Sequence, residues 1–254
     1  MRPCFRVLFF AGILAACSGC GATLHERQAG GSADFDAAKA AYEREDYLDA
    51  IPDFKSYIEQ FPGTDRTDDA LYYLGECYLR QKDYALASGQ FDRLQRDFPT
   101  SPLQAIALFE LARCDDLQSR GAQYDQRETQ RALGRYNQFL DQYPEHSSAP
   151  DARARIAILG DRLAEKRFRT AGLYWKLRQD GAAAFTLRGL LTEYPDSKWA
   201  SEAALLLADV LARQGKQDEA VETLKKLLAS GPESGLRRRA DERLRALQGS
   251  GTPR

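Results

Sequence analysis

The chain has 254 residues, and its 36 Lys and Arg against 37 Asp and Glu give a formal net charge of −1. This balance argues against nucleic acid, or any other strongly charged polymer, as the partner. Apolar residues make up 43% of the chain and aromatic residues 10%, which excludes general disorder and predicts a folded body.

The first twenty residues predict an export signal. Arg2 and Arg6 precede an apolar run at 7–14, and this run is too short to span a bilayer. The run ends in Leu14-Ala15-Ala16-Cys17, which resembles a bacterial lipobox with Cys17 as the acylated first residue of the mature protein. An ordinary signal peptide cut near Ala16, with the thiol incidental, is the alternative.

Lipidation of Cys17 predicts a stable membrane anchor, because each buried methylene contributes about 0.8 kcal/mol and several chains add together. Ser18 stands where an Asp would resemble an inner-membrane retention signal, which favours the outer membrane. Removing residues 1–16 takes away two arginines and no acid, leaving 34 basic and 37 acidic groups and a net charge of −3. Residues 17–33 are rich in glycine and predict a flexible tether.

An aromatic–proline pair recurs along the chain and marks an internal repeat. The copies are Phe61-Pro62, Phe98-Pro99, Tyr143-Pro144 and Tyr194-Pro195, with a degenerate fifth copy at Gly231-Pro232. Twelve positions before each proline stands an alanine, namely Ala50, Ala87, Ala132, Ala183 and Ala220. Large apolar residues stand eight and five positions before each proline, and these offsets trace one stripe of a helix.

A second apolar stripe follows each of the first four prolines. Alanine stands eight positions after the proline, a large aliphatic residue stands at the twelfth, and a small residue follows it. Every repeat is therefore two amphipathic helices, which small residues allow to approach closely and which the proline ends. Cys77 and Cys114 occupy equivalent positions on these faces, which predicts buried small hydrophobes rather than reactive thiols.

This pattern resembles the tetratricopeptide repeat. It predicts an all-α, right-handed superhelix of five helix pairs with a C-terminal capping helix, together spanning residues 34–247. The predicted pairs are 34–45/47–61, 67–80/84–98, 102–118/128–143, 150–178/182–194 and 198–213/217–230, with the cap at 235–247. Residues 248–254 are expected to form a disordered tail.

The sequence offers little for catalysis. Its two histidines are far apart, no His/Cys cluster suits a metal or a Ser-His relay, and no GxGxxG or Walker A motif occurs. The paired acids Asp68-Asp69 and Asp115-Asp116 are expected to point to different faces of their helices and to be solvated. We therefore predict a protein without metal, cofactor or enzymatic activity.

Stacked helix pairs create a concave groove suited to an extended peptide or to a helix or strand of a partner. Its lining comes mostly from the first helix of each pair. Tyr42, Tyr72, Tyr73 and Arg80 are the candidates for holding an apolar peptide end and its carboxylate. Core packing is the alternative interpretation of each tyrosine.

Several stretches appear in a characteristic order. They are Tyr124-Asp125-Gln126, Phe139-Leu140-Asp141-Gln142-Tyr143-Pro144, Asp161-Arg162-Leu163-Ala164, Leu173-Tyr174, Gly181-Ala182-Ala183-Ala184 and Tyr194-Pro195-Asp196-Ser197. With the lipobox and the long third and fourth repeats, this order resembles the BamD family, the repeat lipoproteins of the outer-membrane β-barrel assembly (BAM) machinery. The resemblance covers nearly the whole mature chain.

The resemblance implies a non-enzymatic scaffold on the periplasmic face of the outer membrane that aids insertion of β-barrel proteins. Its N-terminal repeats would receive unfolded outer-membrane proteins, and its C-terminal repeats would dock on the periplasmic domains of a BamA-like barrel, beside other BAM lipoproteins. Arg178 and Arg188 are the candidate barrel contacts. The family commonly has an Arg where this chain has Thr186, so either Arg188 compensates or that contact differs.

Two other functions are compatible with parts of the sequence. A periplasmic repeat protein that coordinates peptidoglycan synthesis with the Tol-Pal system shares the Tyr-Pro pattern. Such proteins usually carry a coiled coil before the repeats, and the tether here has no heptads. An envelope hydrolase with an appended repeat array is the third possibility, but no spare domain is present to hold its active site.

Overall fold

The computed structural model describes the backbone of residues 24–249 and the side chains of residues 34–249. Within that range the chain forms eleven α-helices and no strand, which confirms the all-α prediction. The helices are α1 (Leu24–Glu43), α2 (Tyr47–Gln60), α3 (Thr67–Arg80), α4 (Tyr84–Asp97), α5 (Gln104–Gln118), α6 (Arg127–Gln142), α7 (Ala149–Lys176), α8 (Asp180–Glu193), α9 (Ala200–Arg213), α10 (Gln217–Ala229) and α11 (Ser234–Gly249). Apart from the start of α1, every predicted boundary lies within two residues of the observed one.

Helix α1 begins ten residues earlier than predicted, so the second part of the expected tether is helical. Two adjacent glycines at 30 and 31 favoured a tether, because glycine in a helix interior is less favourable than alanine by about 1 kcal/mol. The stretch before them contains Leu, Glu, Arg, Gln and Ala, which are good helix formers and extend α1 backwards. The predicted signal peptide, residues 17–23 of the tether and residues 250–254 lie outside the described residues.

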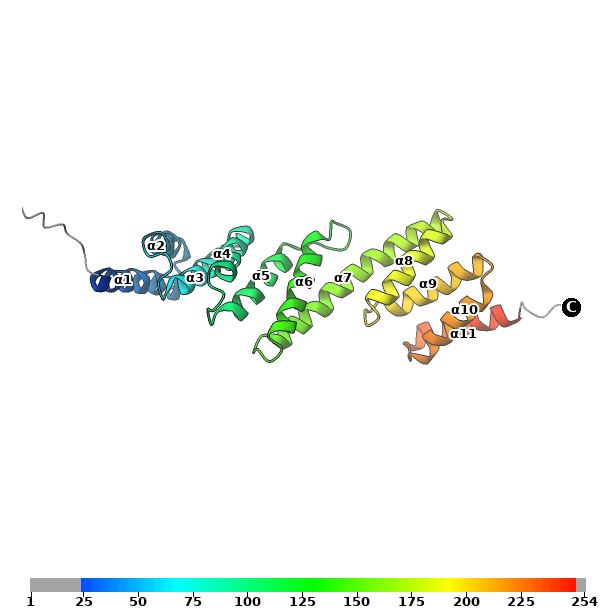
Figure 1. The fold of residues 1–254 in the computed structure, drawn as a ribbon. Helices are drawn as coiled ribbons and strands as arrows, with labels where there is room; N and C mark the ends of the chain where they lie inside the picture. The colour runs from blue at the N-terminus through cyan, green and yellow to red at the C-terminus, as the bar shows by residue number, and fades with distance from the viewer. Residues whose placement is uncertain (1–23, 250–254) are drawn as a thin grey trace, which may run out of the picture.

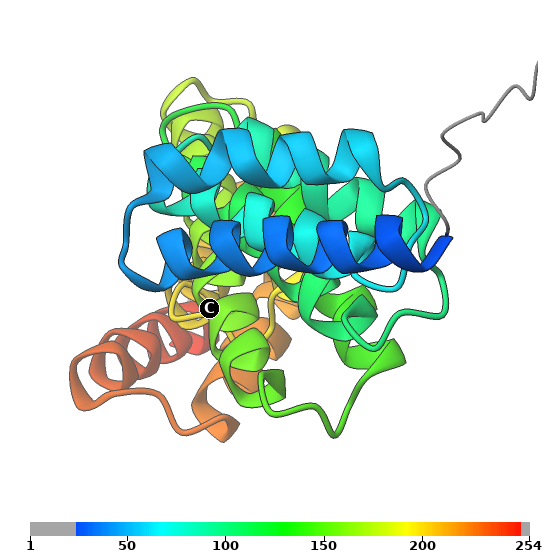
Figure 2. The same cartoon turned by 90° about the vertical axis from the view of Figure 1, so that its left-hand side faces the viewer.

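The helices stack into an elongated array with α1 at one end and α11 at the other (Figure 1). Figure 2, which looks along the array from the α1 end, shows α1 and α2 side by side. Each helix packs mainly against its neighbours in sequence, the arrangement of a solenoid. The tetratricopeptide-repeat prediction is confirmed. None of the helices between residues 24 and 249 has both the length and the apolar composition needed to cross a membrane.

The turns within the helix pairs share one backbone geometry. Glu45, Lys82 and Arg178 have φ angles of 64°, 64° and 61°, and Gly215 holds the same position with φ 78°. In each turn this residue donates its N–H to the carbonyl three residues earlier, and the next N–H reaches the carbonyl five residues earlier. This is the hydrogen-bond pattern of a glycine-type helix end. In the third repeat the connection 119–126 replaces the tight turn.

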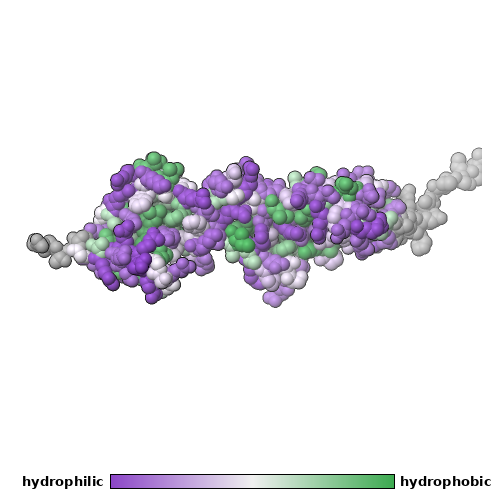
Figure 3. All heavy atoms as spheres, turned by 180° about the vertical axis from the view of Figure 1, so that it is seen from behind, coloured by the Kyte–Doolittle hydropathy of each residue, from purple (hydrophilic) through white to green (hydrophobic). Residues whose placement is uncertain are grey.

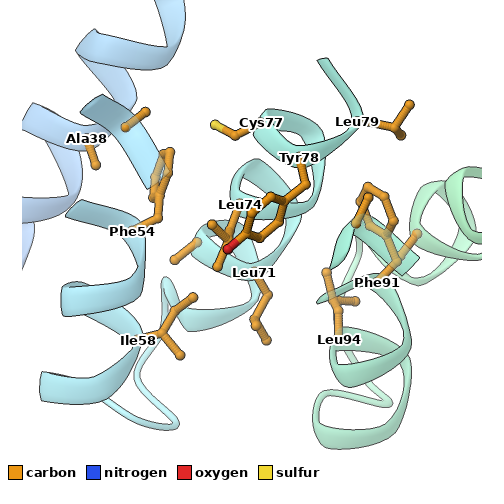
Figure 4. Packing of buried hydrophobic residues seen from close by; sticks show 14 of the residues in the cluster. Ala38, Phe54, Ile58, Leu71, Leu74, Cys77, Tyr78, Leu79, Phe91 and Leu94 are labelled. Atoms are coloured by element: carbon orange, nitrogen blue, oxygen red, sulfur yellow. The ribbon is translucent and has the colours of Figure 1, made fainter. Parts of the chain in front are cut away.

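The core follows the repeat pattern closely. All five alanines that stand twelve residues before the prolines are fully buried. Figure 4 shows Phe54, Leu74 and Phe91 among the side chains that fill the space between α2, α3 and α4. A Cβ atom added at Gly75 would lie 2.7 Å from the Phe91 ring, so the small residue there permits close helix packing as predicted. Its counterpart Ala157 is exposed, so the fourth repeat departs from that rule.

Cys77 and Cys114 are both free and completely buried. Burial, with Glu76 and Glu110 nearby respectively, raises the pKa of each thiol to about 12. Since the thiolate is the reactive form, both side chains act as small hydrophobes, which confirms the prediction.

The adjacent acids Asp115 and Asp116 are buried, so the expectation that they are solvated is wrong. They do point to different helices: Asp115 pairs with Arg135 of α6 at 2.5 Å, and Asp116 pairs with Arg155 of α7 at 2.6 Å. The sequence pattern places charges on helix faces but does not show which arginine a neighbouring helix supplies. The two pairs tie α5 to both following helices.

Candidate binding surfaces

The three candidate tyrosines lie together on α1 and α3 and are called the tyrosine cluster below. The ring centroids of Tyr42 and Tyr73 are 5.1 Å apart, and those of Tyr72 and Tyr73 are 5.7 Å apart. Tyr73 also stacks on Phe54, with ring centroids 5.8 Å apart. All three are half-buried and pack against the N-terminal core, so the core-packing interpretation holds for their inner faces while part of each ring remains accessible.

Arg80 joins the tyrosine cluster through a buried acid. Its Nη2 lies 3.5 Å from Oε2 of Glu76, and its guanidinium also hydrogen-bonds to the Tyr42 hydroxyl. Burial, followed by the nearby Glu76 carboxylate, raises the pKa of Tyr42 to about 12. The Arg80 side chain remains 51% exposed, whereas Glu76 is buried and its Oε1 has no hydrogen-bond partner among the described residues. The structure therefore brings all four predicted groove residues together.

A second acid–arginine pair on α5 completes this surface. Glu110 is buried and accepts a 3.0 Å hydrogen bond from Nη1 of Arg113, whose side chain is 42% exposed. Burial, and next the Glu76 carboxylate, raise the pKa of Glu110 despite that arginine. The two carboxylates are therefore close enough to interact. Two buried acids hold two exposed guanidinium groups beside the tyrosine cluster.

Sequence reasoning missed Glu76, Glu110 and Arg113. The sequence does contain a signal for the two acids. Each glutamate stands directly between residues of the apolar face of its helix. An acid inside such a stripe needs a partner when it is buried. The arrangement can bind rather than react: the arginines offer donors to a carboxylate, and the tyrosines offer apolar surface with a polar edge.

Arg178 and Arg188 occupy different settings. Arg178 forms the left-handed residue of the α7–α8 turn, and its side chain is exposed. Arg188 lies on α8, where its Nη2 is 2.5 Å from Oε2 of Glu219 on α10. No contact between the two arginines is recorded among the described residues, so they do not form one cluster.

Three exposed apolar side chains lie on the α7–α8 hairpin and are called the apolar patch below. Leu173 and Leu177 are one helical turn apart on or just after α7 and are 55% and 59% exposed, and Phe185 on α8 is 81% exposed. Figure 3 shows hydrophobic atoms protruding from a mostly hydrophilic edge of the C-terminal half. Sequence reasoning did not single these residues out, because a helical pattern does not distinguish an inward from an outward leucine at a repeat junction.

The predicted lipidation site Cys17 lies outside the described residues. Between residues 24 and 249, no three or more His, Cys, Asp or Glu side chains are grouped so that they could hold a metal ion.

Helix pairs with shared turns and a repeat-spaced core define the chain as a tetratricopeptide-repeat protein of the solenoid class. The family model "YfiO: Outer membrane lipoprotein" matches residues 28–227, which is most of the chain. The chain belongs to this family.

Curated relatives agree with this assignment. The chain is 25% identical to "Outer membrane protein assembly factor BamD" of Caulobacter vibrioides, over 70% of this chain and 58% of that protein. The protein of the same name from Haemophilus influenzae is 27% identical, over 66% of this chain and 68% of the relative. The Vibrio cholerae protein of that name is 24% identical, over 78% of this chain and 86% of the relative. The match thus spans less than two thirds of the Caulobacter protein's length.

Solved repeat structures are more distant. The TPR2AB domain of yeast Sti1 is 11% identical with a TM-score of 0.45, covering 88% of this chain and 84% of that one. A tetratricopeptide repeat protein from Parabacteroides merdae is 17% identical with a TM-score of 0.40, and the match covers 88% of this chain and 94% of that one. The fold assignment therefore depends on this chain's own helix pairs, turns and core.

Proposed function

We propose that the chain is a non-enzymatic binding component of the machinery that assembles proteins into the outer membrane, with a BamA-like barrel and other BAM lipoproteins as its partners. The match to the outer membrane lipoprotein family over residues 28–227 carries this proposal. The names of the relatives support it, because each is an outer membrane protein assembly factor. Two separate surfaces at opposite halves of the array suit a scaffold that holds a substrate and a partner together.

Acyl chains on Cys17 would attach the protein to the periplasmic face of the outer membrane. Only six residues separate Cys17 from the first residue of α1, so the tether is at most about 25 Å long when fully extended. The variant Cys17→Ala should fold normally and lose its membrane attachment. Recovery of this variant in the outer-membrane fraction in cells lacking its partners would refute the anchor.

The tyrosine cluster with Arg80 and Arg113 is the proposed receptor for unfolded outer-membrane proteins. A strand ending in an aromatic residue would place its ring against the tyrosines and its terminal carboxylate on the arginines. Glu76 and Glu110 restrain the guanidinium groups, which lowers the entropy lost on binding. The two acids offset the charge of the two arginines, so the fixed directions of the guanidinium groups, rather than long-range attraction, would select the ligand.

A peptide with an aromatic last residue and a free carboxylate tests the receptor surface. Arg80→Gln should weaken its binding by about tenfold, since one charge-assisted hydrogen bond is lost. Arg93→Gln is the matched control, because Arg93 pairs with Asp97 on α4 and is similarly exposed. Equal binding of the same peptide with an amidated end would show that the carboxylate is not recognised.

The apolar patch and Arg178 are the proposed contact with the periplasmic domains of the barrel subunit. Large exposed apolar side chains beside an arginine form the usual centre of a protein interface. Arg188 already pairs with Glu219, so it would contribute only by exchanging that partner.

Affinity purification from native membranes tests this contact. The double variant Phe185→Ser, Leu177→Ser should lose most of the co-purified barrel subunit while keeping its thermal stability. Leu48→Ser is the matched control, because Leu48 is 73% exposed at the other end of the array. Unchanged recovery of the barrel with the double variant would refute the patch as the contact. Recovery of peptidoglycan synthases or Tol components without any barrel subunit would instead favour the alternative function, which is to coordinate peptidoglycan synthesis with the Tol-Pal system.

A further inference from the structure

Three cations gather around the connection between α5 and α6. The Arg120 guanidinium lies 4.6 Å from the centre of the Tyr124 ring, and Nζ of Lys166 donates a 2.9 Å hydrogen bond to the Tyr124 carbonyl. Arg162 donates a hydrogen bond to Oγ of Ser119. Figure 1 shows this connection projecting from the array beside α7. These three cations, called the loop cations below, form no ion pair among the described residues.

This arrangement differs from that of the other cations on the same part of α7. Between residues 155 and 169 the remaining arginines each have an acidic partner: Arg155 pairs with Asp116, Arg167 with Glu193 and Arg169 with Glu165. The loop cations have only neutral oxygens or a ring as partners, which orient a positive charge without cancelling it. The positive field of this surface is therefore uncompensated.

The connection that carries Arg120 and Tyr124 is held firmly. The Gln126 side-chain amide donates hydrogen bonds to the carbonyls of Gly121 at 2.9 Å and Tyr124 at 3.0 Å, and its oxygen accepts one from Thr129. Tyr124 remains 47% exposed on this frame. A rigid exposed tyrosine with an arginine on its face is preorganised for binding, since little side-chain freedom remains to be lost.

The one nearby acid of the connection does not neutralise the site. Asp125 pairs with Arg127, with Oδ2 and Nε 2.7 Å apart, and hydrogen bonds from that arginine lower the pKa of the carboxyl group. A cavity of about 260 Å³ adjoins Lys166 and is also lined by Leu163, Tyr194 and two charged side chains that already have partners, Asp125 and Arg167. Its volume is below the range for drug-sized ligands and suits one side chain.

We propose that the loop cations, Tyr124 and this cavity form a second peptide-binding site, which takes an acidic segment of a partner polypeptide. Carboxylates of the segment contact Arg120, Arg162 and Lys166, and a neighbouring apolar side chain packs against Tyr124 or enters the cavity. A polypeptide fits this site better than a lipid surface, because a flat headgroup layer cannot fill a hollow beside a projecting ring. The site is separate from the tyrosine cluster and from the apolar patch, so it does not depend on either proposed contact.

Fluorescence anisotropy with the mature full chain tests the site. The probe is a fluorescein-labelled peptide, Glu-Asp-Phe-Asp-Glu, amidated at its C-terminus so that it carries no terminal carboxylate. The double variant Arg120→Gln, Lys166→Gln should raise the Kd of the probe by about tenfold or more, because two charge-assisted contacts are lost. Arg153→Gln with Lys176→Gln is the matched control, since it removes two exposed cations of α7 that lie outside the site and should change the Kd less than about twofold. Arg162→Gln alone provides a second variant, and circular dichroism establishes that each protein folds.

Four results would overturn the proposal. An equal loss in the control variant would show diffuse surface attraction, and unchanged binding in folded Arg120→Gln, Lys166→Gln and Arg162→Gln proteins would place the peptide elsewhere. Equal affinity for the peptide with Gln and Asn in place of its acids would remove the role of charge. Finally, loop-cation-dependent binding to vesicles of phosphatidylglycerol and phosphatidylcholine, without binding of the probe peptide, would identify a membrane surface instead.

Discussion

The two ends of the array fill the same repeat positions with different side chains. The N-terminal core is built on aromatic residues such as Phe35, Phe54 and Phe91, whereas the C-terminal core consists mainly of alanine and leucine. The phenylalanines are enclosed, whereas the half-buried tyrosines of α1 and α3 pack on their outer side, so the N-terminal core reaches the surface as the tyrosine cluster.

This difference also separates the two kinds of surface. At the N-terminal end, polar edges of tyrosines meet buried acids and arginines, which gives a surface suited to a peptide with a charged end. At the C-terminal end, surplus apolar residues point outward from the α7–α8 hairpin, which suits contact with a folded partner. One repeat pattern thus supports two modes of binding, because the pattern fixes the core positions and leaves the other positions free.

The largest expected effect comes from removing an aromatic residue of the N-terminal core. Phe54 is fully buried, contacts Phe35 edge-on and stacks on Tyr73. Phe54→Ala should lower the free energy of unfolding by about 3–5 kcal/mol, the range for a buried phenylalanine. In a repeat array this loss should act mainly on nearby helices, so amide exchange should accelerate in α1–α4 and remain slow in α9–α11. Equal acceleration at both ends would show that the two regions unfold as one unit.

A smaller effect is expected where the aromatic core touches a glycine. Gly75→Ala adds a Cβ atom 2.7 Å from the buried Phe91 ring, so the free energy of unfolding should fall by about 1–2 kcal/mol despite the better helix propensity of alanine. Gly89→Ala on α4 is the matched control, because nothing lies within 4 Å of the added atom. The control should gain up to about 1 kcal/mol, and urea unfolding of both variants measures the difference. A gain in both would mean that the Phe91 ring moves away freely.

The sequence predicted the fold well because the residues that define the repeat are the same residues that form the core. Ala50 and its equivalents, together with the large apolar residues at fixed offsets, are the residues that helix packing buries. The start of α1 was missed because two glycines outweighed the good helix formers before them. In physical terms, glycines lower the local helix propensity, but they do not show whether the helix continues in the residues before them.

The binding surfaces were predictable only in part. Tyr42, Tyr72, Tyr73 and Arg80 could be chosen because they lie on first helices of the repeats, and they do lie together. The pairing of Glu110 with Arg113, and the uncompensated charge of the loop cations, depend on side-chain positions that helical periodicity does not contain. The same limit explains the burial of Asp115 and Asp116.

The titration of Glu110 offers a pH test of the N-terminal surface. Its raised pKa means that the folded protein keeps this proton to higher pH than the unfolded chain does. From the unfolded carboxyl pKa of about 4.3 upward to the raised folded value, increasing pH should therefore lower the free energy of unfolding. Glu110→Gln removes this contribution, so the wild type should lose more stability than the variant between those two pH values.

Urea unfolding at a series of pH values checks this expectation. Glu222→Gln on α10 is the control of opposite sign, because the hydrogen bond from Lys226 lowers the pKa of Glu222. A lowered pKa contributes stability above the unfolded value that is lost as the pH falls. Identical pH dependence of the wild type and Glu110→Gln would contradict a buried titrating acid at the tyrosine cluster.

The smallest expected effect compares equivalent turns at the two ends. Lys82 in the second repeat and Gly215 in the fifth both have positive φ, and both donate to the carbonyl three residues earlier. A side chain in this conformation costs about 1–2 kcal/mol, partly offset by the greater freedom of glycine in the unfolded chain. Lys82→Gly should therefore raise the free energy of unfolding by about 0.5–1 kcal/mol, and Gly215→Lys should lower it by a similar amount. If thermal unfolding shows the opposite signs, the left-handed turn is not the shared geometry of the repeats, and the two ends differ in their backbone as well as in their side chains.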